Sequence, residues 1–362
     1  MNSILAFLLV LSILILVHEL GHFFMAKLAG VWVEEFGFGL PPRIFGKKIG
    51  QTIYSLNLLP FGGFVRLHGE SSLEGAKKPK KAFMSKGKSA RLLILLAGVI
   101  MNFLLAVLAF AIVYSFTGIP RESKNVKIID ISSGSPAQIS GLTVGDVVRS
   151  VEGEEVTSSE EFINLIEQNK GKKTLLELDG GNKLSVIPRD NPPEGEGPLG
   201  VGITSIEIYY PPIWQRPFYG VYYGMEDAIF WGKEVLNGIF NLIGGVFRGN
   251  VPQDLAGPVG IYALTSEVSK VGTIALIHFM GILSVNLAIL NVLPFPALDG
   301  GRVLFVLIEW IFGKKVTPKF EGFLHTVGMA ILLFIILAIT ARDIQRLISA
   351  GSVSSFVEGV LR

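Results

Sequence analysis

Two histidines and a glutamate stand in a pattern that is typical of metal sites, the stretch "HELGH" at residues 18–22. On a helix, His18 and His22 occupy positions i and i+4, so both imidazoles project from one face. Glu19 lies beside them, where a carboxylate can take a proton from a water that the metal activates. The pattern predicts zinc ligands at His18 and His22 and a general base at Glu19. Two buried histidines satisfied by hydrogen bonds are the alternative.

The surroundings of this pattern favour the metal interpretation. It lies in an apolar run, where an ionisable side chain at the bilayer centre costs at least about 2.5–3.5 kcal/mol. The chain has only 5 histidines, and two of them stand at the metal-binding spacing. It has no cysteine, which excludes disulfides, thiolate ligands and a cysteine nucleophile. A bound metal is therefore the better explanation of the buried polar groups.

A third ligand is expected far along the chain, because a catalytic zinc takes three protein ligands and keeps one position open. The stretch "NVLPFPALDGGR" at 291–302 ends an apolar segment with two prolines, which remove backbone donors and stop a helix. Asp299 follows, next to the flexible pair Gly300 and Gly301. Asp299 is the candidate ligand, and an ordinary loop carboxylate is the alternative.

The amino-acid composition indicates that these residues belong to a membrane protein. The chain has 362 residues, 50% hydrophobic and 17% charged, with a mean hydropathy of +0.52. That is too apolar for an ordinary soluble domain. Four segments can span the bilayer, at 3–27, 91–116, 273–293 and 323–341. The first lacks the basic start of a signal peptide and is read as a retained span. The net charge of +2 gives no support to nucleic-acid binding.

The distribution of lysine and arginine predicts the topology. Residues 28–90 carry a dense basic load, which assigns them to the cytoplasm and the N-terminus to the outside. Segment 117–272 is then outside and the C-terminus ends outside, although Arg342 and Arg346 weigh mildly against this. Segment 294–322 is inside with its basic residues Arg302, Lys314, Lys315 and Lys319. His22 and Asp299 then share the cytoplasmic half of the bilayer.

A small extracytoplasmic domain is expected at 122–206. Strands are predicted at 125–131 and 147–153, and a hairpin around Asp179, Gly180 and Gly181. Ser158 and Glu161 form a capping box at the start of a helix over 158–169. The order resembles a PDZ domain of the bacterial type, most specifically at "SPAQISGLTVGDVVRSVEG". Any small mixed α/β domain is the alternative.

Residues 207–272 are rich in aromatic side chains, which belong at a membrane–water boundary. We expect this region to lie on the outer leaflet. A fifth span at 227–247 is the competing interpretation, but it would put Lys233, Glu234 and Asn237 in hydrocarbon. The expected fold class is therefore a polytopic α-helical membrane protein with about four spans, a membrane-associated β-hairpin and an inserted PDZ-like domain. Its parts are 1–117, 122–206, 207–272 and 273–362.

The combination resembles the site-2 proteases, the intramembrane zinc metalloproteases. HELGH lies in the first span, "LDG" preceded by Asn and Pro lies in a later one, and a PDZ-like domain lies between them. The stretches "GGFVRLHGE" (62–70), "AGVIMNFLLA" (97–106) and "GPVGI" (257–261) are also similar to family stretches. The resemblance implies Zn²⁺ bound by His18, His22 and Asp299, with Glu19 as acid/base. Some relatives carry two PDZ domains, whereas this chain has room for one, which leaves the physiological substrate open.

The expected reaction is hydrolysis of peptide bonds within or beside the membrane helix of single-pass substrates, in a bacterial cytoplasmic membrane. Substrates trimmed beforehand by another protease, such as anti-sigma factors or signal-peptide remnants, fit the family. A hairpin at 52–68 turning at Pro60–Gly63 could hold the unwound substrate as an added strand, with Gly62, Gly63 and Arg66. Asn291 could also bind substrate. A purely structural hairpin and a capping Asn291 are equally compatible with the sequence.

Two other functions stay open at this point. A metal transporter or sensor could use the same ligands, but would need neither Glu19 nor a PDZ domain. An inactive scaffold that recruits peptides would show a broken HExxH motif, and here the motif is intact. The PDZ-like domain could exclude bulky ectodomains or capture a new C-terminal carboxylate. The sequence does not name the substrate, the first-cut protease, the substrate gate or the oligomeric state.

Overall fold

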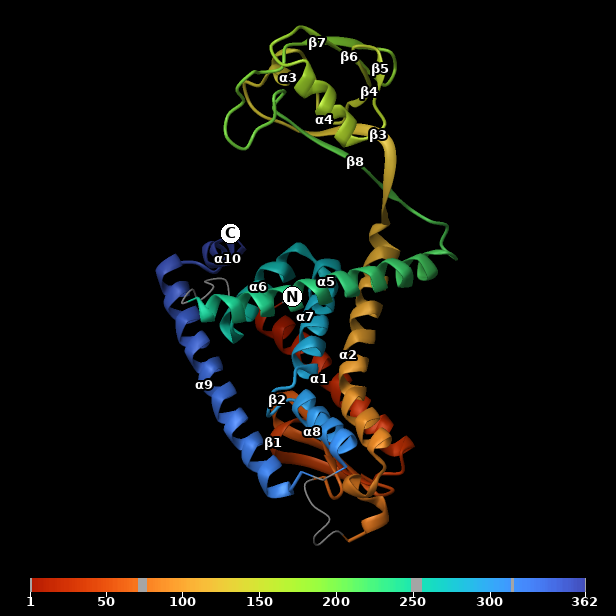
Figure 1. Cartoon of the computed structure of the whole chain (residues 1–362), viewed down its shortest axis with the longest axis vertical. Coiled ribbons are helices and arrows are strands. Elements are labelled where there is room, and N and C mark those ends of the chain that lie inside the picture. Colours follow the sequence, from red (N-terminus) through yellow and green to blue (C-terminus); the bar gives the residue numbers. More distant parts are fainter. Residues whose placement is uncertain (1, 71–76, 249–255, 314–315, 362) are drawn as a thin grey trace. The chain divides into compact units, whose positions relative to one another are not determined.

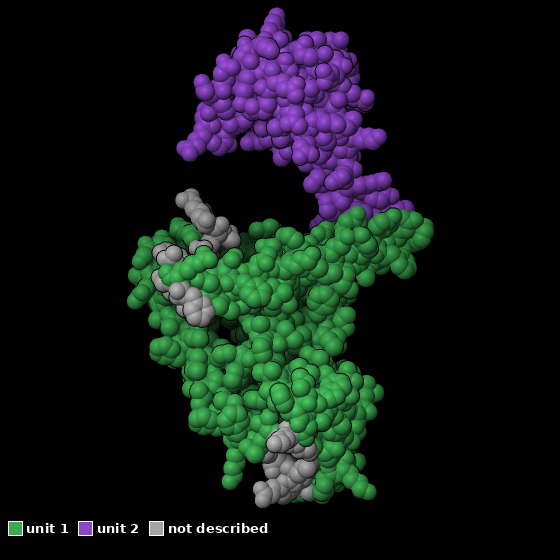
Figure 2. Space-filling view, in the orientation of Figure 1, with its two compact units in different colours: residues 1–116, 213–362 green, residues 117–212 purple. Residues whose placement is uncertain are grey.

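A computed structural model describes residues 2–70, 77–248, 256–313 and 316–361 (Figure 1). The chain forms two compact units, coloured separately in Figure 2. The first unit combines Met1–Phe116 with Ile213–Arg362, and the second is Thr117–Pro212. The second unit encloses the predicted domain at 122–206. Lys314 and Lys315, used above for topology, lie outside the described residues.

Four of the described helices are long and apolar enough to cross a membrane. They are α1 (Ser3–Leu28), α2 (Lys88–Thr117), α7 (Thr273–Val292) and α9 (Pro318–Ala350). Each contains one of the four predicted spans almost entirely, so the coarse expectation of a polytopic helical membrane protein is confirmed. The predicted orientation in the bilayer remains a prediction.

Helices α1 and α2 pack closely because small residues stand where they cross. A Cβ built on Gly21 of α1 would lie 2.3 Å from the carbonyl oxygen of Ala97 on α2. Only glycine allows this backbone approach, as is common between membrane helices. Nearer the N-terminus of α1, Val10 and Leu14 pack with Leu276 of α7. The close contact brings the HELGH turn of α1 directly against α2.

The first unit contains further helices, α5 (Arg216–Phe247), α6 (Pro258–Val271), α8 (Asp299–Phe312) and α10 (Val353–Leu361). Helix α5 runs across α2 and α7 (Figure 1), and its Gly220 and Gly224 lie against the α2 backbone at Ala111 and Val107. Of the helices that the structure describes, α5 is not among the four apolar enough to span. The surface position of 207–272 remains a prediction.

The sheet of the first unit corrects the predicted hairpin. The chain does reverse direction around Pro60–Gly63, because 53–56 runs parallel to 35–38 and 63–65 runs antiparallel to it, but the two arms do not pair with each other. Instead β2 (Thr52–Leu67) pairs with β1 (Val33–Ile49), and the connecting turn lies between the paired residues Ile49 and Thr52. The first half of β1 contacts both halves of β2, since Phe36 faces both Val65 and Tyr54. The stretch 63–67 of β2 therefore forms one edge of the sheet.

The second unit is a mixed α/β domain. Its sheet has the order β7-β6-β4-β3-β8, with β5 paired to β4. The strands are β3 (Ile119–Ile131), β4 (Val147–Val151), β5 (Glu154–Glu155), β6 (Thr174–Leu178), β7 (Lys183–Val186) and β8 (Val201–Tyr209), with α3 (Pro136–Ile139) and α4 (Ser159–Gln168). The predicted hairpin is confirmed by β6 and β7. The capping box is confirmed too, since Ser158 Oγ accepts the Glu161 N–H at 3.1 Å.

Candidate active site

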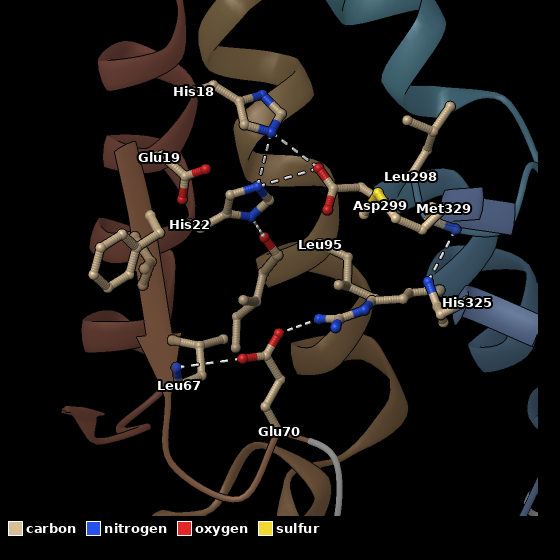
Figure 3. A pocket seen from close by; sticks show the side chains of 15 residues that line it. His18, Glu19, His22, Leu67, Glu70, Leu95, Leu298, Asp299, His325 and Met329 are labelled. Carbon is tan, nitrogen blue, oxygen red and sulfur yellow. Dashed lines mark hydrogen bonds and ion pairs between the residues drawn. The ribbon is translucent and has the colours of Figure 1, made fainter. Parts of the chain in front are cut away.

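A pocket of about 530 Å³ opens beside the HELGH turn, in the first unit. Four elements supply its walls: α1, the edge of β2, α2 and the segment around the start of α8, with α9 closing one side (Figure 3). The residues that line it include His18, Glu19, His22, Val65, Glu70, Ile94, Asp299, Arg302, His325 and Met329. The structure thus brings the predicted catalytic residue and the three predicted ligands to one cavity.

The three predicted ligands meet at a single point. Asp299 Oδ2 lies 3.0 Å from His18 Nε2 and 3.2 Å from His22 Nε2. The two Nε2 atoms are 3.2 Å apart. Zinc bonds of about 2.0–2.1 Å place neighbouring ligand atoms of a tetrahedral site about 3.3 Å apart. Among the described residues, these three side chains form the one group of His, Asp or Glu that is close enough to share a metal ion. The donor set and its spacing fit zinc.

The orientation of His22 is fixed by α2. Its Nδ1–H donates a hydrogen bond to the carbonyl oxygen of Ile94 at 2.8 Å, and only 9% of the residue is exposed. In the neutral ring a proton on Nδ1 leaves Nε2 unprotonated, and a metal ligand needs that lone pair. The backbone of α2 therefore selects the tautomer of His22 that can bind zinc.

His18 has a comparable partner in Asn102, also on α2. Nδ2 of Asn102 lies 3.3 Å from His18 Nδ1, while Oδ1 of Asn102 is buried with no hydrogen-bond partner among the described residues. Turning the amide over would let Oδ1 accept the His18 Nδ1–H, with Nδ2 then in the position that the oxygen leaves. Zinc binding at Nε2 requires that arrangement. The orphaned amide oxygen thus fits a site built for a metal.

Gly98 of α2 leaves the space that the two rings occupy. A Cβ at this position would lie 2.4 Å from His22 Nε2 and 2.7 Å from His18 Cε1. We expect Gly98→Ala to displace the ligands and to lower the zinc content of the purified protein by at least about ten-fold, as loss of ligand orientation does. Zinc measured by mass spectrometry tests this, with Gly87→Ala as control because a Cβ on Gly87 meets nothing within 4 Å. Full zinc occupancy in Gly98→Ala would contradict the tight fit.

A compact turn aims Asp299 at the histidines. Within it, the N–H of Leu298 donates to the carbonyl oxygen of Phe295 at 3.2 Å, and the N–H of Gly301 donates to that of Leu298 at 3.1 Å. A Cβ on Gly300 would lie 2.1 Å from the carbonyl oxygen of Leu293, so only glycine fits there. The two prolines end α7, and the turn then places Asp299 at the first position of α8.

Glu19 is held next to the edge of β2. Its carboxylate accepts the N–H of Val65, and a Cβ on Gly63 would lie 3.5 Å from its Cγ. The carboxylate therefore faces the same pocket as the ligand cluster without belonging to it (Figure 3). The predicted role of Glu19 as general base needs a carboxylate in this pocket that does not bind the metal.

The other predicted substrate-binding residues lie in different places. Gly63 is beside Glu19, whereas Asn291, Gly62 and Arg66 are not among the residues that line the pocket. Arg66 is 59% exposed at its side chain and lies 3.6 Å from Glu35. Glu309 of α8, which does not line the pocket, forms a buried ion pair with Arg91 at 2.8 Å. Substrate binding by these residues remains a prediction.

Sequence reasoning missed several residues of the site. Asn102 and Gly98 lie in the stretch 97–106, which was singled out only as similar to the family. Glu70 pairs with Arg302 at the pocket and also accepts the N–H of Leu67 at 3.4 Å. His325 bonds to the Asp299 turn. The scarcity of histidine is the signal that could have drawn attention to His325.

Comparison with known proteins decides the family. Residues 6–335 match the model of peptidase family M50. The chain belongs to this family. M50 peptidases are the site-2 proteases, so the expectation of an intramembrane zinc metalloprotease is confirmed, and the transporter and the inactive scaffold are set aside.

Three relatives illustrate the match over nearly the full length of this M50 peptidase. A Clostridium perfringens protein named as a candidate zinc metalloprotease is 34% identical, covering 93% of this chain and 97% of its own. Zinc metalloprotease RasP of Geobacillus kaustophilus is 29% identical, covering 96% and 98%. The regulator of sigma-W protease RasP of Bacillus subtilis is 29% identical, covering 96% and 99%.

Proposed function

We propose that this M50 peptidase holds zinc with His18, His22 and Asp299 and cleaves peptide bonds within or beside substrate membrane helices, using Glu19 as acid and base. The observation that carries the proposal is the ligand cluster within 4.8 Å, beside a carboxylate, on a helix apolar enough to span a membrane. When bound, zinc supplies an activated water and polarises the scissile carbonyl. Glu19 takes the proton of that water and returns it to the leaving amine.

The substrate must be extended before it is cut, because a helix shields its own peptide bonds. The edge of β2 offers a place to hold it. The N–H of Val65 points to Glu19 and that of Leu67 to Glu70, so both turn away from β1. Alternate residues of an antiparallel strand direct their backbone groups the same way, so Gly63 also faces outward. A substrate strand added at Gly63 would run past Glu19 and the ligands.

Removing one outward donor tests the strand-addition proposal. We expect Gly63→Pro to keep zinc but to cut a membrane-helix reporter at least about ten-fold more slowly, because one main-chain hydrogen bond to a substrate is lost. Gly63→Ala is the matched control, since it adds a Cβ and retains the N–H. Equal rates in the two variants would exclude a role for the Gly63 donor.

The second unit is proposed to be a PDZ domain on the extracytoplasmic side that restrains access to the site. It connects α2 to α7, opposite to the basic connection between α1 and α2, which the distribution of lysine and arginine assigns to the cytoplasm. A folded domain on that side would collide with the ectodomain of an uncut substrate. Capture of a new C-terminal carboxylate is the other role open to a PDZ domain.

Deleting 122–206 separates the two roles. Arg121 and Glu207 face each other across β3 and β8, so a two-residue turn can join them. If the domain excludes bulky substrates, the shortened protein should cleave a long-ectodomain reporter that the full chain spares, with the trimmed reporter cleaved as before. Loss of cleavage of the trimmed reporter would instead favour carboxylate capture.

Membrane-anchored regulators are the proposed substrate class. The Bacillus subtilis relative is named a regulator of sigma-W, and anti-sigma factors that another protease has already trimmed fit both that name and a size-restricted site. We place the protein in a bacterial cytoplasmic membrane, with the zinc site in its cytoplasmic half and the aromatic helix α5 on the outer leaflet.

A further inference from the structure

His325 is a polar residue on the apolar helix α9, and its ring reaches the turn that carries Asp299. Its Nδ1 accepts a hydrogen bond from the N–H of Ala297 at 2.9 Å, two residues before Asp299 (Figure 3). Neighbouring N–H groups of the turn, those of Phe295, Leu298 and Gly301, bond within the turn itself. The backbone N–H of Ala297 thus forms a hydrogen bond from the turn to another helix, α9.

Ala297 has an unusual backbone conformation that needs support. Its φ of +81° lies in the left-handed region, and of the described non-glycine residues only Glu152 shares a positive φ. A side chain with a Cβ disfavours this region, so the conformation persists where surrounding contacts determine it. The bond to His325 is such a contact, and it acts on the residue whose conformation sets the direction of the chain into Asp299.

The protonation of His325 follows from this bond. A ring nitrogen that accepts from an N–H carries no proton, so the proton of the neutral ring is on Nε2. That Nε2 is buried and has no hydrogen-bond partner in the described part of the chain. A buried donor without a partner is unfavourable, and an apolar residue on this apolar helix would avoid it. Compared with an apolar side chain, the imidazole of His325 adds a hydrogen-bond acceptor, Nδ1, for the N–H of Ala297.

A second contact of α9 lies one helical turn further on. A Cβ on Gly328 would lie 2.5 Å from the carbonyl oxygen of Pro296, so the helix backbone rests directly on the turn. His325 and Gly328 are at positions i and i+3 and share one face of α9. Both residues of α9 therefore contact the same short segment, Pro296 and Ala297.

We propose that His325 is a positioning residue that fixes the conformation of Ala297 and thereby directs the carboxylate of Asp299 to the metal. The inference rests on the proposed function in one respect, the role of Asp299 as zinc ligand. Helix α9 supplies no zinc ligand, but through His325 it contributes to the affinity of the site for zinc.

Zinc affinity of the full-length purified protein, measured by competition with a chromophoric chelator, tests the proposal. We expect His325→Leu to weaken zinc binding by about 10–100-fold, the range for residues that orient a ligand. His325→Asn should restore most of the affinity, because its amide oxygen is as many bonds from Cα as Nδ1 is. His325→Gln, whose amide reaches further, should not. Thr326→Val is the matched control, because Thr326 is on the same helix, does not line the pocket, and bonds through its Oγ1 to the carbonyl oxygen of Gly322 in that helix.

A double-mutant cycle with Ala297→Gly distinguishes positioning from general packing. Glycine adopts a positive φ without strain, so His325→Leu should cost much less zinc affinity in the Ala297→Gly background than in the natural chain. Equal losses in both backgrounds, or unchanged affinity in His325→Leu, would overturn the proposal. If His325→Leu does not fold, equal affinities of His325→Asn and His325→Gln would overturn it instead. Asp299→Asn is measured in parallel: if it keeps zinc, the ligand assignment has failed rather than the role of His325.

Discussion

Glu19→Gln retains zinc and loses cleavage. Glutamine is close to glutamate in shape but cannot accept the proton of the attacking water at neutral pH, and general acid–base catalysis contributes about 10²–10⁴-fold to such reactions. Because Glu19 is not one of the three converging ligand side chains, the metal content should remain that of the natural protein. The measurement is the cleavage rate of a membrane-helix reporter beside the zinc content of the same preparation.

A ligand variant is the control for this experiment. His18→Ala removes one of the three ligand atoms and should lose both zinc and cleavage, whereas Glu19→Gln should lose cleavage alone. If Glu19→Gln cleaves at the natural rate, Glu19 is not the base. If it loses zinc as fully as His18→Ala, its carboxylate has a role in holding the metal that the geometry does not suggest.

Asp299→Asn is the second change with a large expected effect. A neutral amide is a poorer ligand for zinc than a carboxylate, and the change also removes the negative charge next to His18 and His22. We expect zinc affinity to fall by more than about 100-fold, beyond the range for residues that merely orient a ligand. Cleavage should fall with it and recover in part when excess zinc is supplied.

Asp227→Asn is the matched control for Asp299→Asn. Asp227 also lies close to a histidine, with its Oδ2 3.5 Å from His278 Nε2, but it is outside the pocket. Its substitution should leave zinc binding as it is. Equal zinc affinity in the two variants would move the third ligand away from Asp299.

The four apolar helices and the convergence of the three proposed ligand side chains could be predicted from the sequence because each rests on a local or strongly coded signal. A run of about 20 apolar residues predicts a span, and the spacing of His18 and His22 predicts a shared face whatever surrounds it. Asp299 could be added from the prolines before it and the topology, which placed it in the same half of the bilayer as His22. The structure puts its carboxylate 3.2 Å from that histidine.

The hairpin shows where local signals mislead. Pro60, Gly62 and Gly63 look like a turn, and the chain does reverse there, but the residues on either side pair with β1 rather than with each other. Gly62 has a φ of +89°, which suits the reversal of the chain between these two arms. Residues 35–38 of β1 lie between the two arms, and no pattern inside 52–68 contains that information.

Asn102 and His325 show a different limit. Each is a single polar residue in an apolar helix, which by sequence alone is compatible with packing, capping or function. Their roles come from proximity in space, to His18 from 84 residues away in one case and to Ala297 from 28 residues away in the other. Periodicity describes which face of a helix a residue occupies, but it does not identify the atom opposite.

Mapping the cut made by the purified protein in a membrane-helix reporter tests the central claim most directly. The natural chain and Glu19→Gln are reconstituted in lipid, each with zinc and after its removal by a chelator, and the products are identified by mass spectrometry. We predict cleavage at a peptide bond within or at the edge of the apolar segment, by the natural chain with zinc alone. A cut confined to the soluble part of the reporter, or one that persists without zinc or in Glu19→Gln, would contradict the account.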